Sequence, residues 1–276
     1  MKRFKKVYFE ISNICNLSCS FCPGTKRAPK IMEPSEFKTV ITKVAPFTDY
    51  VYFRLLGEPL LHPNLKDYLN ICEEHGLKVI ITTNGTLLNK QGDVLLRSDS
   101  HYKTVISLHS FEANLNQNFD EYINDCLNYA KAAEGEKIVV LRLWNNGGED
   151  KLNREILQKI ENRFPAPWRE TRGGKQIGNN IYIQFGDKFD WPDIENQTLN
   201  ETAFCYGMRD QIGVLCDGTV VPCCLDNNGE INLGNILNTD LDDIINSPRA
   251  LNIYNGFSNR KACEELCKKC SFARKF

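Results

Sequence analysis

The 276-residue sequence contains no run of about 18 apolar residues, the length that a transmembrane helix needs. It carries almost no net charge, −1 in all, so no overall field favours nucleic acid or an anionic membrane as a partner. The basic start Met1–Lys6 is not followed by the apolar segment of a signal peptide. These absences argue against an exported, membrane-bound or nucleic-acid-binding protein and predict a cytoplasmic one.

What the sequence has in excess is cysteine, with twelve residues. Structural disulfides are rare in a reducing compartment, so clustered cysteines there more often bind metal or take part in redox chemistry. The cysteines gather in two groups, one near each end of the chain, with Cys72 and Cys126 alone between them. These two lie in helical patterns, where a free cysteine behaves as a small buried hydrophobe. The distribution predicts two metal sites on one scaffold.

The first two-thirds of the chain alternates short apolar runs with helical patterns. The runs predict six strands, at Val7–Ile11, Tyr50–Leu55, Lys78–Thr83, Thr104–Leu108, Ile138–Leu143 and Ile181–Phe185. Helices are predicted over 34–44, 64–76, 119–133 and 151–163. Repeated strand–helix–strand units favour a parallel sheet with right-handed crossovers. Because six units are too few for a closed eight-stranded barrel, we expect an α/β fold with a partial (β/α)6 barrel, its chemistry at the carboxyl ends of the strands.

The pattern loosens over 163–200, where we expect a transition with one strand embedded in it. From residue 205 onward the chain reads as a small cysteine-rich module. It begins with a hairpin that turns at Asp217-Gly218 and continues with short helices over 240–246 and 249–254. We therefore expect two domains, a barrel over residues 1–185 and a cysteine-rich domain over residues 186–276.

Three cysteines, Cys15, Cys19 and Cys22, follow the first predicted strand. Thiolates are the usual ligands of iron–sulfur clusters, and three ligands on a four-iron cluster leave one iron free to bind something else. A zinc site that lacks its fourth ligand, or cysteines without any metal, would also explain three residues alone. The position directly after a strand favours a cluster with an open iron.

The pattern Cys-x3-Cys-x-aromatic-Cys, with Phe21 as the aromatic residue, resembles the radical S-adenosylmethionine (radical SAM) superfamily. In that family the open iron binds the amino and carboxylate groups of S-adenosylmethionine. Electron transfer then cleaves this cofactor to a 5′-deoxyadenosyl radical. The resemblance implies a SAM-binding [4Fe–4S] cluster on the three cysteines, with Phe21 packed near the adenine.

Further matches follow later strands, and together they cover residues 7–145. Leu56-Gly57-Glu58 is similar to the family's Gly-Gly-Glu element, which contacts the amino group of the cofactor, although Leu56 replaces the first glycine. Asn84 after the third strand and Ser107 on the fourth lie where the family also has recurrent elements. Taken singly, Glu58 would be interpreted as a solvated acid in a turn, Asn84 as a plain turn residue and Ser107 as a buried hydroxyl. The cofactor-binding residues implied by the resemblance are Phe21, Gly57, Glu58, Asn84 and Ser107.

The C-terminal cysteines could form either a zinc ribbon or a second iron–sulfur cluster, and their spacing does not separate the two. The segments Asp-Gly-x-Val-x-Pro-Cys-Cys and Leu-Gly-Asn resemble the SPASM extension of radical SAM enzymes. Only one Cys-x2-Cys pair follows, so the module resembles the shortened, single-cluster version called a twitch domain. The resemblance implies Cys205, Cys223, Cys267 and Cys270 as ligands of an auxiliary [4Fe–4S] cluster. Cys263 could replace Cys205, because Cys263-x3-Cys267-x2-Cys270 repeats the N-terminal spacing.

The resemblance implies a radical SAM oxidoreductase. It would abstract a hydrogen atom and then oxidise its substrate, with the auxiliary cluster as electron acceptor. The expected partners are a small-molecule or peptide substrate and a flavodoxin- or ferredoxin-type reductant. His109 and Arg142, at or near the ends of strands four and five, are candidates for taking up the proton; a structural histidine and a surface arginine are the alternative readings.

Two other functions stay open at this point. A peptide- or protein-modifying enzyme of the same superfamily would use the same radical. The first strand begins at Val7, so we expect no leader-peptide-binding domain before the barrel and instead a separate partner or a small substrate. An iron–sulfur or zinc protein that binds or carries electrons without cleaving S-adenosylmethionine is the second alternative. The Gly57-Glu58 and Asn84-Gly85 elements argue against it, because a carrier needs no cofactor cradle.

Overall fold

The structure is a computed structural model that describes residues 3–114, 118–148, 150–188, 190–199 and 201–275. Its described strands form one continuous sheet in the order β10-β9-β1-β2-β3-β4-β5-β8-β7-β6. The strands are β1 (Lys6–Phe9), β2 (Tyr50–Phe53), β3 (Lys78–Thr83), β4 (His101–Ser107), β5 (Ile138–Asn146), β6 (Arg169–Thr171), β7 (Gly174–Gly178), β8 (Ile181–Asp187), β9 (Gln211–Val214) and β10 (Val220–Val221).

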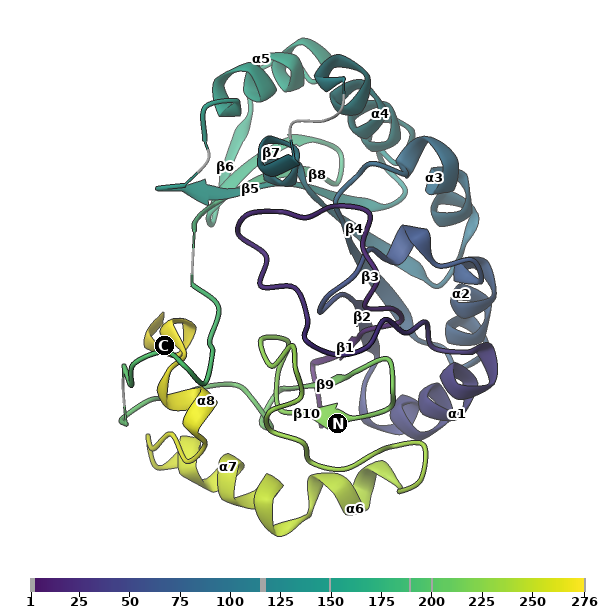
Figure 1. Ribbon diagram of the computed structural model, residues 1–276. Coiled ribbons are helices and arrows are strands. Elements are labelled where there is room, and N and C mark those ends of the chain that lie inside the picture. The colour runs from purple at the N-terminus through teal and green to yellow at the C-terminus, as the bar shows by residue number, and fades with distance from the viewer. Residues whose placement is uncertain (1–2, 115–117, 149, 189, 200, 276) are drawn as a thin grey trace.

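The six strands expected from the sequence are β1 to β5 and β8, and within this set every neighbouring pair is parallel. Helices cover the outer face of this curved sheet, as Figure 1 shows. They are α1 (Pro34–Val44), α2 (Leu65–Glu74), α3 (Leu88–Arg97), α4 (Phe119–Ala132) and α5 (Asn153–Arg163). The prediction of a partial parallel barrel is confirmed.

Helix α1 illustrates how local sequence positions these elements. Pro34 occupies its first turn, where the missing N–H has no partner to lose, and Glu33 and Glu36 form a capping box. Its buried residues recur at helical spacing, as Phe37, Val40, Ile41 and Val44. This apolar stripe packs the helix against the sheet and leaves the opposite sheet face to the barrel interior.

The barrel interior is apolar and aromatic at the amino ends of the strands. A small cluster of Ile80, Val105 and Val140 packs there with the partly buried tyrosines at 50, 52 and 182. Because side chains alternate along a strand, the residues two positions further on point into the same interior nearer the carboxyl ends. The base of the barrel is therefore filled, and its carboxyl end is free to form a cavity.

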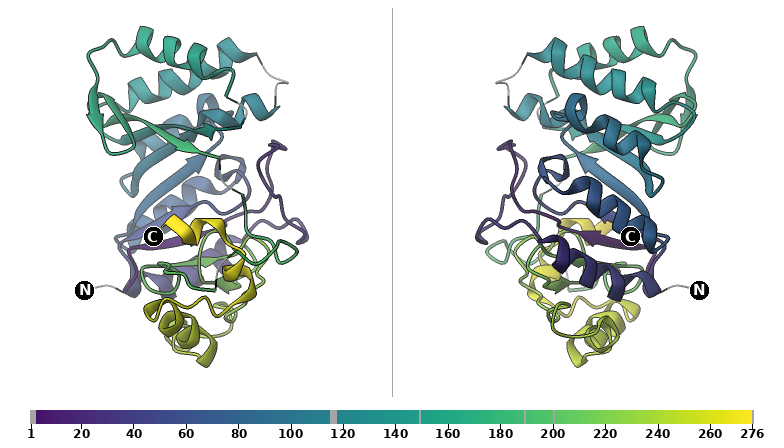
Figure 2. Two further views of the ribbon diagram at one scale, coloured as in Figure 1. Left: turned by 90° about the vertical axis from the view of Figure 1, so that its left-hand side faces the viewer. Right: turned by 90° about the vertical axis from the view of Figure 1, so that its right-hand side faces the viewer.

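The C-terminal module extends the same sheet. Its hairpin of β9 and β10 is antiparallel as predicted, and β9 pairs in parallel with β1, with Val7 opposite Ile212. Three helices follow, α6 (Leu241–Ile245), α7 (Pro248–Ser258) and α8 (Glu265–Lys268). Figure 2 shows this module at the opposite end of the molecule from α4 and α5. The predicted domain boundary after residue 185 falls within β8.

Two parts of the fold differ from expectation. The segment 163–200 was expected to hold one strand, but it holds β6, β7 and β8, with β6 and β7 forming an antiparallel hairpin at the free edge of the sheet. Strands β6 and β7 are largely polar, so they lack the apolar run that indicates a strand. Helix α3 was also not expected. Among the described residues, no helix combines the length and apolar character needed to cross a membrane.

Candidate functional site

A cavity of about 520 Å³ lies at the carboxyl ends of the parallel strands. The N-terminal cysteines line it together with every cofactor-binding or proton-accepting candidate from the sequence: Cys15, Cys19, Cys22, Phe21, Gly57, Glu58, Asn84, Ser107, His109 and Arg142. These residues come from the loop after β1 and from the ends of β2 to β5. The fold thus brings together side chains that lie up to about 130 residues apart in the sequence.

The cysteine loop after β1 is held by side-chain amides. Asn114 donates a hydrogen bond from Nδ2 to Cys19 Sγ at 3.0 Å and accepts one from the Ser18 N–H at 2.9 Å. Burial raises the pKa of the Cys19 thiol to about 11, and Cys22 and Cys15 add to the rise while Asn114 opposes it. The three thiols are therefore close enough to repel one another when ionised, which a bound cation would reverse.

Gly57 shapes the start of this loop. Its φ is +75°, and a Cβ there would lie 2.1 Å from the carbonyl oxygen of Ser12 and 3.0 Å from that of Ile14. The next residue donates its N–H to the Ile14 carbonyl at 2.9 Å. Only glycine allows the β2 turn to approach the cysteine loop this closely.

The backbone also carries strain where the family's first glycine is missing. Leu56 occupies that position, but it is the preceding residue, Leu55, that takes a φ of +140°. Non-glycine residues in such conformations cost about 1–3 kcal/mol and are found mainly at functional sites. The strained backbone conformation of this turn is thus at Leu55, and Leu56 itself has no positive φ.

Glu58 is buried, and its carboxyl group accepts hydrogen bonds from the end of β3 and from its own turn. Its carboxylate accepts hydrogen bonds from the Asn84 N–H at 2.7 Å, the Thr83 hydroxyl at 2.7 Å and the Leu60 N–H at 3.0 Å. Burial raises its pKa to about 7 in spite of these donors. Asn84 in turn donates to Asn16 Oδ1 at 2.9 Å, which joins Glu58 to the cysteine loop.

Phe21, Ser107 and His109 also line this cavity. The Phe21 ring is 5.0 Å from the imidazole of His109. His109 Nδ1 lies 3.1 Å from the backbone carbonyl oxygen of Arg142, and burial lowers the pKa of His109 to about 4. This histidine is therefore uncharged at neutral pH.

A second group of thiols forms in the C-terminal module. Burial raises the pKa values of Cys205, Cys223, Cys267 and Cys270, to about 11 for Cys205, and these thiols add to one another's shifts: Cys270 acts on Cys205, Cys205 and Cys267 act on Cys223, and Cys205 and Cys270 act on Cys267. Cys205 Sγ also accepts the N–H of Gly207 at 3.4 Å. The structure therefore brings together the four residues that the sequence proposed as ligands.

Cys263 lies apart from this group. Its sulfur packs against helix α7, where a Cβ on Gly256 would come within 2.3 Å of it, and it contributes to none of the four thiol pKa shifts. Cys224 also adds to the pKa rises of Cys205, Cys223 and Cys270, so five thiols gather here and Cys263 is not among them.

The donor sets of both thiol groups fit iron–sulfur clusters. Within the described part of the chain, no three His, Cys, Asp or Glu side chains converge on a single metal ion. A cluster has several metal corners, so it accepts thiols that are spread more widely. The amide hydrogen bonds to Cys19 and Cys205 are of the kind that stabilise cluster-bound sulfur.

Comparison with known families agrees with this geometry. Residues 9–116 match the family model of the radical SAM superfamily, and residues 205–271 match that of SPASM, described as an iron–sulfur cluster-binding domain. The chain is a radical SAM protein with a C-terminal SPASM domain. These two domains imply a SAM-binding [4Fe–4S] cluster and auxiliary cluster binding. The number of clusters in the SPASM domain and the individual ligands remain predictions.

Curated relatives match this radical SAM protein over part of their length. An S-adenosyl-L-methionine-dependent 2-deoxy-scyllo-inosamine dehydrogenase of Niallia circulans is 27% identical over 116 residues, which are 40% of this chain and 46% of the dehydrogenase. An AdoMet-dependent heme synthase of Methanosarcina barkeri is 29% identical over 116 residues, which are 41% of this chain and 33% of the synthase. The chain therefore covers less than half of the length of either protein.

Solved structures share the whole fold with the radical SAM protein. BtrN in complex with AdoMet and 2-DOIA has a TM-score of 0.63 at 20% identity, covering 98% of this chain and 94% of BtrN. Streptococcus suis SuiB bound to S-adenosylmethionine has a TM-score of 0.64 at 19% identity, covering 91% of this chain and 68% of SuiB. At such identities the likeness concerns the fold alone.

Three residues of the site were missed in the sequence. Asn114 has no pattern around it that would predict its bond to Cys19. Arg54 and Trp144, which also line the cavity, carry a usable signal. Each lies two positions beyond an inward-facing residue, so strand alternation places it in the cavity.

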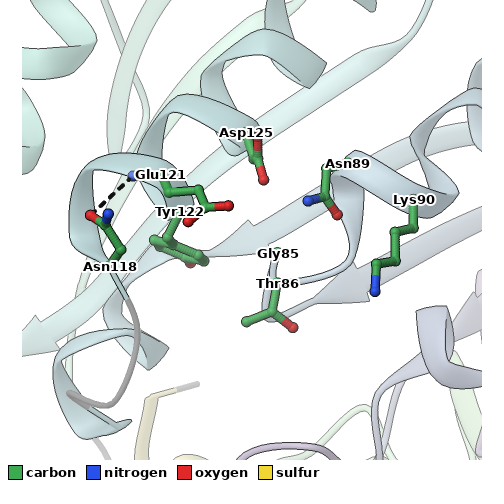
Figure 3. A pocket seen from close by; sticks show the side chains of 8 residues that line it. All are labelled: Gly85, Thr86, Asn89, Lys90, Asn118, Glu121, Tyr122 and Asp125. Atoms are coloured by element: carbon green, nitrogen blue, oxygen red, sulfur yellow. Dashed lines mark hydrogen bonds between the residues drawn. The ribbon is translucent and has the colours of Figure 1, made fainter.

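A second hollow, of about 390 Å³, lies outside the barrel between α3 and α4 (Figure 3). Its lining is polar, with Lys90, Glu121 and Asp125 among the labelled side chains. Tyr122 connects it to the main site, because its hydroxyl donates to the Asn84 carbonyl at 2.8 Å. Tyr122 therefore supports the Asn84 turn from the side of this hollow.

Proposed function

We propose that this radical SAM enzyme abstracts a hydrogen atom from a substrate in the cavity and then oxidises that substrate, with an auxiliary cluster in the SPASM domain as electron acceptor. The observation that carries the proposal is the place of Cys224. It adjoins Cys223 of the second thiol group. Its thiol adds to the rise that burial causes in the pKa of Tyr8, and it raises the pKa of Arg54 against the effect of burial; both residues lie on the barrel side. Arg54 in turn lines the cavity. Cys224, next to a proposed cluster ligand, thus lies near a residue of the cavity wall.

The residues that would hold each group follow from the geometry. Cys15, Cys19 and Cys22 would hold the SAM-binding cluster, and Cys205, Cys223, Cys267 and Cys270 the auxiliary cluster. When bound, these groups supply a radical that takes a hydrogen atom from the substrate and an acceptor for the electron that the substrate then loses. Phe21, Gly57, Glu58, Asn84 and Ser107 are proposed to contact S-adenosylmethionine.

The protein itself would position the cofactor and accept the proton. Three donors from the chain hold the Glu58 carboxyl group in one orientation at the cavity. His109 is proposed to take up the substrate proton, since it is uncharged and lines the cavity. Arg142, the other candidate, carries a charge and is better suited to binding than to accepting a proton.

The test is anaerobic reconstitution with iron and sulfide, followed by reduction and incubation with S-adenosylmethionine. We expect about eight irons per chain and release of 5′-deoxyadenosine. A Cys15→Ala, Cys19→Ala, Cys22→Ala triple variant should release none, and continued release by this variant would refute the assignment of the radical site.

The role of the second thiol group needs a separate variant. Cys267→Ser with Cys270→Ser should still release 5′-deoxyadenosine but should no longer form a substrate product that is two hydrogens lighter, measured by mass spectrometry. Unchanged oxidation by this variant would show that the electron goes elsewhere.

A further inference from the structure

Two arginine side chains belong to the cavity, one from beyond the end of β2 and one from β5. Arg54 follows β2 and lies two positions beyond the inward-facing Tyr52, and Arg142 lies on β5, paired with Ser107 of β4. Both line the cavity. Burial and the neighbouring Arg54 together lower the pKa of Arg142 to about 9, whereas Cys224, Tyr8 and Tyr52 raise the pKa of Arg54 against the effect of burial. Two like charges are thus held close together in a poorly solvated place.

Neither guanidinium has a counter-charge among the described residues. The groups that favour the charge of Arg54 are Cys224, Tyr8 and Tyr52, none of them a carboxylate. Arg142 Nε is buried and has no hydrogen-bond partner. Glu58, the acidic residue of the cavity, is not among the groups that act on either arginine, and its oxygens are already occupied.

A third partly buried arginine supplies an internal comparison. Arg27, which ties the cysteine loop to the sheet, donates to both oxygens of the Glu10 carboxylate at 2.6 Å. Where this fold uses a buried arginine for structure, it provides a carboxylate. A poorly solvated cation without a counter-charge is unfavourable, so the two partly buried arginines of the cavity favour binding of an anion from outside the described chain.

Aromatic rings hold both arginines in place. The guanidinium of Arg142 lies over the Trp144 ring at 3.9 Å, and that of Arg54 lies over the Tyr8 ring at 5.4 Å. Trp144 Nε1 is itself buried without a hydrogen-bond partner. Gly186 on β8 leaves room for this ring, since a Cβ there would come within 2.8 Å of it. Two unsatisfied donors, Arg142 Nε and Trp144 Nε1, thus belong to cavity-lining residues.

We propose that the substrate of this enzyme carries an oxyanion, a carboxylate or a phosphate, which binds between Arg54 and Arg142. The inference rests on the proposed function, whose substrate it describes. A planar guanidinium donates two parallel hydrogen bonds to such a group, and Trp144 Nε1 provides a further donor. Lys188, which also lines the cavity, adds a third positive charge.

The test is isothermal titration calorimetry of the anaerobically reconstituted holoenzyme with inorganic phosphate and, separately, with acetate, each with and without saturating S-adenosylmethionine. We expect one of the two anions to bind with a stoichiometry of one in both states. Arg54→Met and Arg142→Met should each weaken this binding about tenfold or more, and Arg142→Lys less. The matched control is Arg154→Met, an exposed arginine on α5 that should leave binding unchanged.

Three results would overturn the proposal. The first is no anion binding at millimolar concentration, and the second is binding that both Met variants leave intact. The third is competition, in which S-adenosylmethionine abolishes anion binding and Arg142→Met weakens cofactor binding by the same factor; the arginines would then serve the cofactor's own carboxylate. Because none of these measurements needs cofactor cleavage, their failure is distinct from failure of the radical chemistry.

Folding of the variants supplies an independent readout. Removal of a partly buried cation without a counter-charge should leave the urea midpoint unchanged or raise it, whereas removal of a paired one should lower it. Arg54→Met and Arg142→Met should therefore be at least as stable as the parent protein when no anion is present. A clear loss of stability in both would indicate counter-charges supplied by the protein and would contradict the proposal.

Discussion

Arg27 and Glu10 form a buried ion pair in which one guanidinium nitrogen lies 2.6 Å from each carboxylate oxygen. Glu10 also accepts the N–H of Cys216 at 3.2 Å, and Arg27 donates from Nε to the Asn227 carbonyl at 3.1 Å. Arg27 belongs to the segment after the three cysteines, and Cys216 and Asn227 belong to the C-terminal module. This one pair therefore connects the cysteine loop, the first strand and the second cysteine-rich part of the protein.

We predict that Arg27→Met lowers the free energy of unfolding by about 3 kcal/mol, because it leaves the buried Glu10 carboxylate unpaired. Urea unfolding measures the loss. Arg97→Met is the matched control, since Arg97 pairs with Asp93 on an exposed helix face and such pairs contribute about 0.5 kcal/mol or less. Equal effects of the two substitutions would contradict the structural role of the Arg27–Glu10 pair.

Gly57→Ala should prevent formation of the N-terminal cluster. A Cβ at this position lies 2.1 Å from the Ser12 carbonyl oxygen, so the cysteine loop must move. After reconstitution we expect about four irons per chain in place of about eight. Gly76→Ala provides the control, because Gly76 also has a positive φ, of +66°, but no atom within 4 Å of its Cβ position. A variant at position 57 with full iron content would show that the loop can adjust.

Cys205→Ser and Cys263→Ser should differ in iron content. We expect the first to lose about four irons per chain, since Cys205 lies with the other three C-terminal thiols, and the second to lose none. Iron analysis and the electron paramagnetic resonance of the reduced protein measure the difference. The reverse result would assign the fourth ligand to Cys263.

Acid should destabilise the protein partly through His101. Burial lowers its pKa to about 4, with Lys137 adding to the effect, whereas the unfolded chain takes up the proton near pH 6.5. The stabilising contribution of the neutral form is therefore complete above pH 6.5 and is lost as the pH falls towards 4. Between pH 7.5 and 5.5 this loss amounts to about 1 kcal/mol.

The measurement is urea unfolding of the parent protein and of His101→Gln at pH 7.5, 6.5 and 5.5. The variant should lose less stability over this range, because it has no imidazole to protonate in the unfolded state. Other titrating groups act equally in both proteins, so parallel pH profiles would refute the assignment.

The sequence predicted the parallel part of the fold because runs of β-branched and aromatic residues marked every central strand. It did not predict α3, because the interior glycine Gly92 weakens the helical pattern. The packing of Tyr129 explains this glycine, since a Cβ at position 92 would lie 2.9 Å from the Tyr129 ring. The β6–β7 hairpin escaped notice because exposed edge strands need no apolar run. Pairing between β1 and β9 joins residues about 200 positions apart, and no local pattern encodes it.

At the candidate site, the sequence predicted the residues that lie at the ends of strands. The alternation of side chains along each strand and the parallel order of the strands bring these residues together. It gave no signal for Asn114, whose role depends on how two loops meet. The ligand and cofactor roles of the predicted residues stay predictions, but every one of the N-terminal set lines the same cavity.

The pairing of β1 with β9 has a consequence for biosynthesis. Ribosomes add roughly 5–20 residues per second, so β9 is made about 10–40 s after β1. During that interval one edge of the first strand has no partner, and such edges pair readily with other chains. The carboxylate of Glu10, next to this strand, likewise lacks the N–H donor of Cys216 until that residue has been made. We expect the nascent chain to need protection by chaperones, and iron loading of both cysteine groups to follow release from the ribosome.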